Sequence, residues 1–232
     1  MLSENGEGEP MAAKKQFAII GMGRFGTSIA NSLSKMGFEV LAIDSSEQKI
    51  QDVANMVTHA VSAECTDEEA LKALGVRNFD VVVVAIGQDI QASILTTLIL
   101  KDLGVPTIVA KAQNELHGKV LSKIGADKVV FPERDMGMRV AHNLISPNIL
   151  DYIELSDDHS IVEIRATPLM IGKNLKELDI RARYGCNVMA IKNNGKTNIS
   201  PYAEDRIKEG DVLVIIGQNE HLNTMELAFS ES

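Results

Sequence analysis

The sequence contains little cysteine. Of its 232 residues only two are cysteines, Cys65 and Cys186, about half a chain apart. No Cys-x-x-Cys pair and no cluster of cysteine with histidine occurs, so the spacing that a structural zinc site needs is missing. We interpret both residues as free thiols in a reducing cytosol and predict no zinc site.

The sequence also lacks any concentration of positive charge. Its formal net charge is −9. Residues 1–134 hold 13 basic and 17 acidic side chains and the remainder holds 10 and 15, so the negative charge is spread evenly. Binding to a phosphate backbone needs clustered lysine and arginine. DNA and RNA are therefore not expected as partners.

No stretch is long and apolar enough to predict a membrane span. The strongest candidate, residues 81–100, holds one charged residue, Asp89. Residues 87–89 interrupt it, and each half is too short to cross about 30 Å of hydrocarbon. The first 14 residues are polar and acidic; they show no secretory signal and are predicted to form a disordered tail. If the protein acts at a membrane, we expect it to act through a partner.

From residue 16 onward, apolar strands alternate regularly with amphipathic helices. Nearly continuous apolar runs predict strands at residues 17–20, 40–43, 59–62, 81–86, 107–110 and 128–131. Thr66 with Glu69 predicts a capping box at a helix start. Strands linked by helices pair in parallel through right-handed crossovers. Residues 15–134 are therefore predicted to form an α/β domain, a six-stranded doubly wound parallel sheet of the Rossmann type.

The second part of the sequence follows a different rhythm. Residues 135–150 contain a helical stretch and a break at Ser146-Pro147-Asn148, which predicts a crossover helix and linker. Residues 151–232 predict strands at 160–166, 187–192, 197–200 and 212–216, with helices at 174–185 and 219–229. Asn193-Asn194-Gly195 is a hairpin signal, and Asn174 with Glu177 opens a helix. The order βαβββα predicts a small α+β lobe.

Residues 21–26 form a Gly-x-Gly-x-x-Gly pattern in an informative context. A predicted strand ends at Gly21, a helix follows Gly26, and Asp44 ends the second strand 18 residues past Gly26. Gly21 permits a tight turn, Gly23 lets the backbone approach a pyrophosphate, and Gly26 allows close packing of helix and strand. Asp44 is predicted to accept hydrogen bonds from ribose hydroxyls. The pattern therefore predicts a nucleotide site.

The other strand ends are expected to line the same crevice. Lys111 is a candidate phosphate contact, although the residues alone equally allow a solvated surface lysine. His117 is more often a helix histidine than a ligand. Glu133 would be a suitable hard ligand if a divalent ion bridges the phosphates, and is otherwise a solvated carboxylate. The positions at these strand ends are Glu64, Cys65, Ile86, Gly87, Gln88, Lys111, Ala112 and Gln113.

Catalytic groups are not evident. No Walker pattern occurs, so phosphoryl transfer by that route is not predicted. The C-terminal lobe holds two histidines, His159 and His221, and no recognisable nucleophile with its base. The glycine pattern with Asp44 keeps an NAD(P)-dependent oxidoreductase open as an alternative. We expect a binding protein and not an enzyme.

Seven stretches, in order, resemble one family. They are residues 17–26, 78–87, 90–98, 111–114, 123–127, 132–136 and 179–185. Over residues 15–229 the sequence resembles the KtrA- and KtrC-type cytosolic subunits of bacterial Ktr potassium uptake systems, relatives of TrkA. The resemblance implies the two-lobed RCK architecture and homodimers assembled into a homo-octameric ring. That ring would lie in the cytoplasm, on the inner face of the membrane, under a KtrB- or TrkH-like potassium transporter subunit. Regulation of a different cation transporter is the remaining alternative.

The resemblance also implies ligands and their contacts. In this family ATP favours the active form and ADP the inactive one, and NAD or NADH can occupy the same site. On the matching positions, Arg24 would contact phosphates, and Asp44 with Ser45 and Ser46 would contact the ribose. Glu133 would hold Mg²⁺ or another divalent cation near the γ-phosphate. Phe25, His117 and the strand-end positions would complete the site, with Glu64 in place of the small polar residue expected there.

A second ligand is implied for the C-terminal lobe. Members of this family often bind cyclic di-AMP at a dimer interface, which lowers transport. From the residues alone, Arg181 is a reasonable phosphate partner and equally an exposed arginine that favours the helix dipole. The matching positions are Ile180, Arg181, Ala182, Asn187, Val188 and Pro201.

Overall fold

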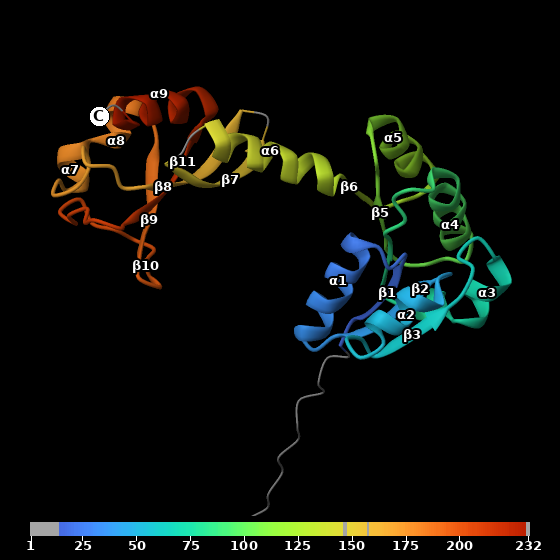
Figure 1. Cartoon of the computed structure of the whole chain (residues 1–232). Coiled ribbons are helices and arrows are strands. Elements are labelled where there is room, and N and C mark those ends of the chain that lie inside the picture. Colours follow the sequence, from blue (N-terminus) through green and yellow to red (C-terminus); the bar gives the residue numbers. More distant parts are fainter. Residues whose placement is uncertain (1–13, 146–147, 157, 231–232) are drawn as a thin grey trace, which may run out of the picture. The chain divides into compact units, whose positions relative to one another are not determined.

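The computed structural model describes residues 14–145, 148–156 and 158–230. The chain divides into two compact units, Met1–Glu133 and Arg134–Ser232, each of which is described by itself (Figure 1). The predicted tail lies outside the described residues except for Lys14, and so do residues 146–147 of the predicted helix break. Among the described residues, no helix is long and apolar enough to cross a membrane.

The first unit is built on a six-stranded sheet with the order β3-β2-β1-β4-β5-β6. All neighbouring strands pair in parallel, and the order changes direction between β1 and β4, as in the Rossmann fold. The predicted doubly wound sheet is thus confirmed. Its strands are β1 (Gln16–Ile20), β2 (Glu39–Asp44), β3 (His59–Ser62), β4 (Val81–Val84), β5 (Ile108–Lys111) and β6 (Lys128–Val130).

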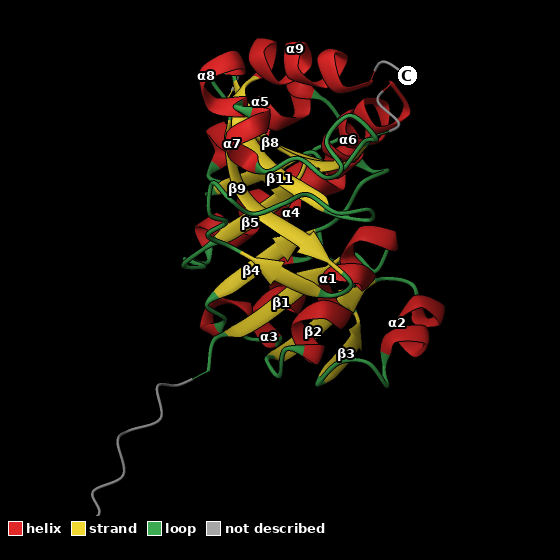
Figure 2. Cartoon of the chain, turned by 90° about the vertical axis from the view of Figure 1, so that its left-hand side faces the viewer, coloured by secondary structure: helices red, strands yellow, loops and turns green. Residues whose placement is uncertain are grey.

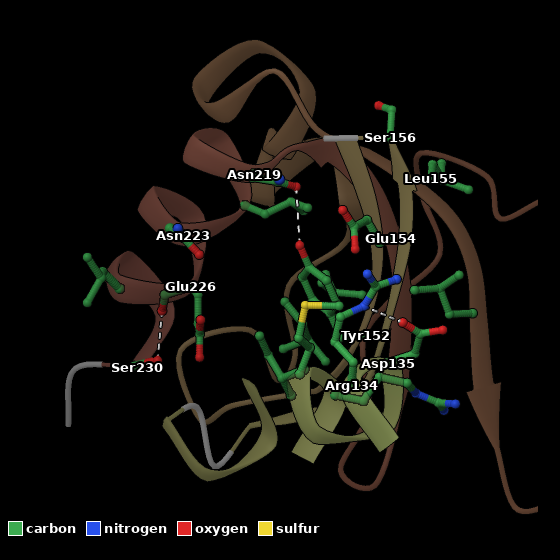
Figure 3. Close-up of a pocket in the computed structure, with 18 residues that line it drawn as sticks. Arg134, Asp135, Tyr152, Glu154, Leu155, Ser156, Asn219, Asn223, Glu226 and Ser230 are labelled. Carbon is green, nitrogen blue, oxygen red and sulfur yellow. Dashed lines mark hydrogen bonds and ion pairs between the residues drawn. The ribbon is translucent and has the colours of Figure 1, made fainter. Parts of the chain in front are cut away.

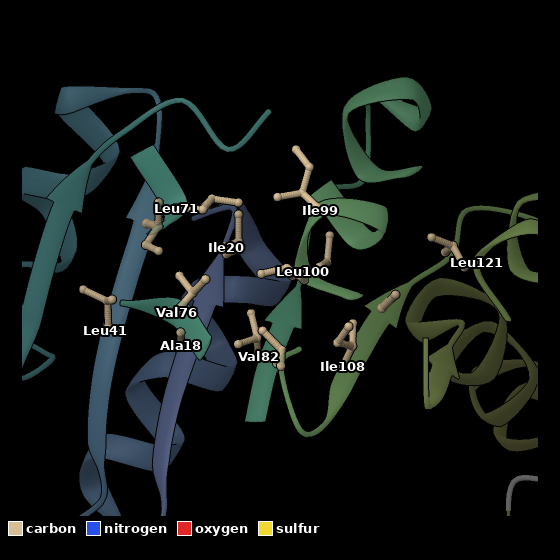
Figure 4. Close-up of a cluster of buried hydrophobic side chains, with 14 of the residues drawn as sticks. Ala18, Ile20, Leu41, Leu71, Val76, Val82, Ile99, Leu100, Ile108 and Leu121 are labelled. Atoms are coloured by element: carbon tan, nitrogen blue, oxygen red, sulfur yellow. The ribbon is translucent and has the colours of Figure 1, made fainter. Parts of the chain in front are cut away.

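Helices cover both faces of this sheet, which explains why its strands are apolar throughout. Ile19 of β1 packs in the cluster on the side of α1 (Arg24–Lys35) and α2 (Glu47–Val53). Its neighbours Ala18 and Ile20 point to the opposite cluster, drawn in Figure 4. That cluster lies under α3 (Glu68–Ala73), α4 (Ile90–Asp102) and α5 (Glu115–Ile124); a short 3₁₀ helix, η1 (Val76–Asn78), precedes β4.

One predicted helix start in this unit was wrong. The N-cap of α3 is Asp67, whose carboxylate accepts hydrogen bonds from the backbone N–H groups of Glu69 and Ala70. Thr66 instead donates its hydroxyl to Glu64 at 2.9 Å. Aspartate and threonine both cap helices, so the sequence allowed a helix start at either residue. The helix begins after Asp67, one residue later than predicted.

The second unit contains a five-stranded sheet with the order β10-β9-β11-β8-β7, and α6 (Pro132–Ile145) leads into it. All neighbouring strands pair antiparallel. The buried core includes Ile164, Leu213, Ile215 and Met225 (Figure 2 shows the elements). The strands are β7 (Ile149–Ser156), β8 (His159–Arg165), β9 (Asn187–Asn193), β10 (Lys196–Asn198) and β11 (Val212–Gln218); the helices are α7 (Leu175–Leu178), α8 (Ile180–Tyr184) and α9 (Asn219–Ser230).

The predicted order βαβββα omitted β7. The pairing of β7 with β8 shifts register twice, between Ile149 and Asp151 and between Glu154 and Ser156, which breaks the alternation that a sequence pattern relies on. Ile149 and Leu150 therefore belong to a strand and not to a linker. The predicted helix at 174–185 is divided into α7 and α8 by Asp179, whose φ of +46° is left-handed.

Two local predictions in the second unit are confirmed. Asn174 and Glu177 form a reciprocal capping box at the start of α7. Asn194 and Gly195 both have positive φ, +46° and +76°, as a two-residue hairpin between β9 and β10 requires.

Candidate functional site

The candidate site begins where β1 ends, between its two neighbouring strands. The backbone N–H of Gly21 donates to the carbonyl of Ile43 at 2.7 Å, and that of Ala85 donates to Ile20 at 2.7 Å. Gly21 has a φ of +97°, and a Cβ there would lie 3.1 Å from the carbonyl carbon of Ala85. Only glycine fits this turn without strain. The chain therefore turns sharply at the switch point of the sheet, where ligands of this fold bind.

The other two glycines of the pattern differ in what surrounds them. A Cβ on Gly26 would lie 1.9 Å from the carbonyl oxygen of Gly21, so a side chain at residue 26 would collide with the turn. A Cβ on Gly23 would meet nothing within 4 Å, and the φ of Gly23 is −78°, which any residue adopts. The fold itself therefore requires Gly26 but not Gly23. Open space beside Gly23 is what an approaching phosphate would need.

The start of α1 faces this space without a cap from the chain. Gly23 is the N-cap and offers no side chain to the first N–H groups, no side-chain cap is formed among the described residues, and the first turn contains no acidic residue. The first N–H groups of a helix have no partner within the helix, and the helix dipole makes this end positive. Arg24 in this turn is exposed and Phe25 is partly buried. The arrangement is chemically suited to an anion.

Asp44, the last residue of β2, is held firmly. Its carboxylate accepts hydrogen bonds from the backbone N–H of Met22 at 2.7 Å and of Ser46 at 2.9 Å. Burial raises the pKa of Asp44, but these backbone hydrogen bonds and the ammonium of Lys49 outweigh burial and bring the pKa below its ordinary value. An ionised carboxylate thus anchors the glycine loop and stands beside it.

Sequence reasoning missed Lys49. Its Nζ lies 3.1 Å and 3.3 Å from the two carboxylate oxygens of Asp44. A lysine in the first turn of a helix is disfavoured by the dipole, and that is the signal which could have indicated a carboxylate partner. Ser46 caps α2 through its hydroxyl, and the hydroxyl of Ser62 donates to the carbonyl of Ser45. Asp44, Ser45 and Ser46 therefore form one connected edge.

Lys111, the last residue of β5, forms an ion pair with Glu133. Nζ of Lys111 lies 2.5 Å from Glu133 and 5.8 Å from the centre of the Phe25 ring. A Cβ on Gly87 would lie 3.1 Å from the same Nζ. The hydrogen bond from Lys111 lowers the pKa of Glu133, whose side chain is 71% exposed. Lys111 is a buried cation and not a solvated surface lysine, and Glu133 presents a carboxylate to solvent.

His117, at the start of α5, is 2% exposed. Its Nδ1 accepts the backbone N–H of Gln113, which follows Ala112 after β5. Burial lowers the pKa of His117, so the neutral ring carries its proton on Nε2. Among the described residues this buried Nε2 has no hydrogen-bond partner. Buried polar atoms are nearly always paired, so the orphaned atom leaves one hydrogen bond to be made.

The remaining predicted positions, Glu64, Cys65, Ile86 and Gln88, follow β3 and β4 in the chain. The carbonyl of Cys65 accepts the hydroxyl of Thr96 from α4, and burial raises the pKa of the Cys65 thiol. Glu64 is exposed and accepts hydrogen bonds from Thr66, which lower its pKa. Ile86 and Gln88 lie in the loop between β4 and α4.

Glu133 is the carboxylate considered for a divalent cation. Among the described residues, no group of three or more His, Cys, Asp or Glu side chains is arranged to hold a metal ion. Mg²⁺ is commonly bound by one or two carboxylates together with ligand phosphates. The ionised, exposed Glu133 would fit that role, and a phosphate chain and water would supply the other ligands.

The positions considered for a cyclic dinucleotide lie on the second unit. Arg181 and Ala182 are exposed on α8, whereas Ile180 is 3% exposed and belongs to the core. Pro201 lies in the loop that follows β10; the carbonyl of Ala203 in that loop accepts the N–H of Lys176 in α7. Asn187 and Val188 begin β9, next after α8 along the chain. Ile180 therefore supports this surface from beneath and does not face solvent.

The second unit also has a large pocket that sequence reasoning did not find. It measures about 1100 Å³ and is lined by α6, β7, β8 and α9 (Figure 3). Two of the lining residues, Tyr152 and Asn219, contact the buried Ser160, whose hydroxyl lies 2.6 Å from the Tyr152 hydroxyl and 2.8 Å from Oδ1 of Asn219. Arg139 pairs with Asp151 at 2.6 Å on another side. None of the residues predicted for a ligand lines this pocket.

Fold and site define a Rossmann domain with a glycine-rich turn at the switch point of its sheet, followed by a small α+β domain. Comparison with known proteins agrees. Residues 17–132 match the TrkA-N domain model and residues 159–230 match the TrkA-C domain model. The chain is 55% identical to Ktr system potassium uptake protein C of Bacillus subtilis, over 92% of this chain and 96% of that protein. It is 52% identical to potassium uptake protein A of the same organism, over 91% and 96%.

A solved structure shares the fold. The GsuK RCK domain superposes with a TM-score of 0.66 at 20% identity, and the match covers 97% of this chain and 49% of that one. The chain belongs to the TrkA-type family of Ktr potassium uptake proteins.

Proposed function

We propose that this chain is the cytoplasmic regulatory subunit of a potassium uptake system and that nucleotides bound at the glycine crevice set its activity. The observation that carries the proposal is the open space at Gly23, framed by the uncapped start of α1 and the fixed carboxylate of Asp44. A helix start suits phosphates and a carboxylate at the end of β2 suits a ribose. The potassium uptake system is inferred from two relatives, the Ktr system potassium uptake proteins to which the chain is 55% and 52% identical.

The proposed ligands are ATP and ADP, with NAD or NADH as the alternative occupant. The GsuK channel, which shares the fold at 19% identity, has been solved bound to NAD, so this fold can hold a dinucleotide. Arg24 would contact phosphates, and the edge of Asp44, Ser45 and Ser46 would meet the ribose. The orphaned Nε2 of His117 is a further donor for a polar ligand.

The Lys111–Glu133 pair would distinguish ATP from ADP. Lys111 is a buried cation at the crevice, and a third phosphate adds negative charge and acceptor oxygens within its reach. Glu133 would then be released to a divalent cation that neutralises the same phosphate. A ligand shifts a conformational equilibrium only by its differential affinity for the two states. This rearrangement would supply that difference.

The proposed assembly is a homodimer that builds a homo-octameric ring under the membrane subunit. Apolar side chains that single chains normally bury are exposed here. Leu95, Leu98 and Leu116 are exposed on α4 and α5, while Met136, Val140 and Leu144 lie exposed at four-residue spacing on α6. Exposed apolar patches of this kind mark protein interfaces. The exposed surface of α8 with Arg181 is the proposed site for cyclic di-AMP.

Calorimetric titration of the purified chain with ATP, ADP, NADH and cyclic di-AMP, with and without Mg²⁺, tests the ligands. We expect ATP and ADP to bind, and both to be lost in Asp44→Ala. Potassium flux into vesicles that contain a KtrB-type membrane subunit and this chain should then be higher with ATP than with ADP. Equal flux with the two nucleotides would contradict the gating proposal. Binding of NADH alone would favour an NAD(P)-dependent oxidoreductase.

A further inference from the structure

The carboxylate of Asp44 has little capacity left for a ligand. An ionised carboxylate offers about four acceptor positions. The backbone N–H of Met22 occupies one on Oδ2 and that of Ser46 occupies one on Oδ1. The ammonium of Lys49 lies within hydrogen-bond distance of both oxygens, at 3.1 Å and 3.3 Å. A ribose diol approaching this carboxylate would therefore find its acceptor positions taken.

The three partners of Asp44 are not equally replaceable. Met22 and Ser46 donate from the backbone, within the glycine loop and at the cap of α2, so their hydrogen bonds persist as long as the fold does. Lys49 donates from a long side chain that is 50% exposed, whereas Asp44 is 7% exposed. An exposed lysine leaves an ion pair for water at small cost. Lys49 is thus the partner that a ligand can displace.

We propose that Lys49 is a latch that competes with the ribose of a bound nucleotide for Asp44. In the free chain the ammonium neutralises the carboxylate and keeps it in place. When a nucleotide enters, its 2′- and 3′-hydroxyls take the two outer acceptor positions and Lys49 turns toward solvent. The inference rests on the proposed nucleotide site. It assigns Lys49 of α2 a role in the free chain, before any nucleotide has bound. Lys49 thereby makes the affinity for a ribose weaker than Asp44 alone would give.

The test compares two ligands on two variants. ATP carries the diol, and 2′,3′-dideoxy-ATP has the same base and phosphates without it. In Lys49→Met the two outer acceptor positions of the carboxylate are free, so the affinity for ATP should rise by about two- to fivefold, the range that a partly exposed ion pair is worth. The affinity for dideoxy-ATP should stay unchanged, because that ligand has no hydroxyl to use the freed positions. Lys49→Arg keeps a cation at Asp44 and should bind both ligands as the unaltered chain does.

Lys72→Met is the matched control. Lys72 is also an ion-paired lysine of similar exposure, 44%, but its partners are Glu68 and Glu69 on α3. The variant removes the same charge and should leave both affinities unchanged. Lys49→Gln, which stays polar, replaces Lys49→Met if circular dichroism shows that the methionine variant does not fold.

The outcomes separate the latch from the proposed function. If the unaltered chain binds ATP but Lys49→Met does not bind it more tightly, the latch is wrong and the nucleotide site stands. An equal loss of affinity for ATP and dideoxy-ATP in Lys49→Met would identify Lys49 as a contact to the phosphates, which also overturns the latch. If the unaltered chain binds no nucleotide in the presence of Mg²⁺, the proposed function and the latch fail together.

Discussion

The two units present their candidate sites in opposite ways. In the first unit the site lies at the ends of parallel strands, and two of its charged groups are buried: backbone N–H groups hold Asp44, and an ion pair with Glu133 holds Lys111. In the second unit the candidate positions lie on α8, at the start of β9 and in the loop after β10, and Arg181, Ala182 and Asn187 among them are exposed. A parallel sheet gathers the ends of distant strands along one edge. An antiparallel sheet with one covered face leaves its helices and loops to solvent.

This contrast links function to stability. Groups that hold the first site also hold the first unit together, so changes there should affect folding and binding at once. The exposed side chains on the α8 surface contribute little to the stability of the second unit, so changes there should affect binding alone. The following predictions test that difference, from the largest expected effect on stability to the smallest. Hydrogen exchange measured by mass spectrometry at increasing urea concentration reports the two units separately.

Gly26→Ala should have the largest effect. The added Cβ would lie 1.9 Å from the carbonyl oxygen of Gly21, so β1 and α1 would have to separate. We expect the free energy of unfolding of the first unit to fall by about 3 kcal/mol, the upper range for overpacking. Exchange in the second unit should not change.

Gly23→Ala is the control for that prediction. Its Cβ would meet nothing within 4 Å, so the first unit should keep its stability. ATP affinity should nevertheless fall by about tenfold or more, because the methyl group takes the space of a phosphate. If Gly23→Ala binds ATP normally, the phosphates do not lie where the glycine pattern predicts.

Asp44→Ala should have the next largest effect. The change leaves the N–H groups of Met22 and Ser46 without an acceptor and Lys49 without its partner. Unsatisfied buried donors cost about 1–3 kcal/mol, so we expect a loss of about 2 kcal/mol in the first unit together with the loss of nucleotide binding. Asp44→Asn, which keeps one acceptor oxygen, should recover part of the stability. Full stability of Asp44→Ala would show that this carboxylate does not hold the glycine loop.

His117 should make the stability of the first unit depend on pH. Burial lowers the pKa of His117 from its ordinary value of 6.5. As pH falls below 6.5 the unfolded chain binds a proton before the folded chain does, so stability is lost until the folded pKa is reached. The slope should be at most about 1.4 kcal/mol per pH unit. In His117→Asn, which keeps an acceptor for Gln113, urea titrations between pH 7 and pH 5 should lack this component; an unchanged slope would contradict it.

The sequence predicted the parts that obey local rules. The glycine pattern with Asp44 follows from fixed spacing along one βαβ unit, and the capping box of Asn174 with Glu177 spans four residues. It missed β7, because two register shifts remove the alternation, and it placed a cap at Thr66 where Asp67 serves. The Lys49–Asp44 pair and the pocket beside Tyr152 depend on which side chains meet after folding. Periodicity carries no information about such contacts.

Arg181→Ala, like Gly23→Ala, should leave stability nearly unchanged and therefore tests the other side of the comparison. Arg181 is exposed on α8, and surface substitutions usually change stability by less than about 0.5 kcal/mol. We expect normal unfolding of both units and a loss of cyclic di-AMP affinity of about tenfold or more, because an arginine is removed from the proposed phosphate site. Arg183→Ala, on the same helix and stacked on Tyr184, is the matched control and should bind cyclic di-AMP normally.

If both arginines contribute equally, the site is a general positive surface and not one built around Arg181. If Arg181→Ala unfolds the second unit, then the exposed surface holds its domain together as the buried site of the first unit does, and the distinction between the two units fails.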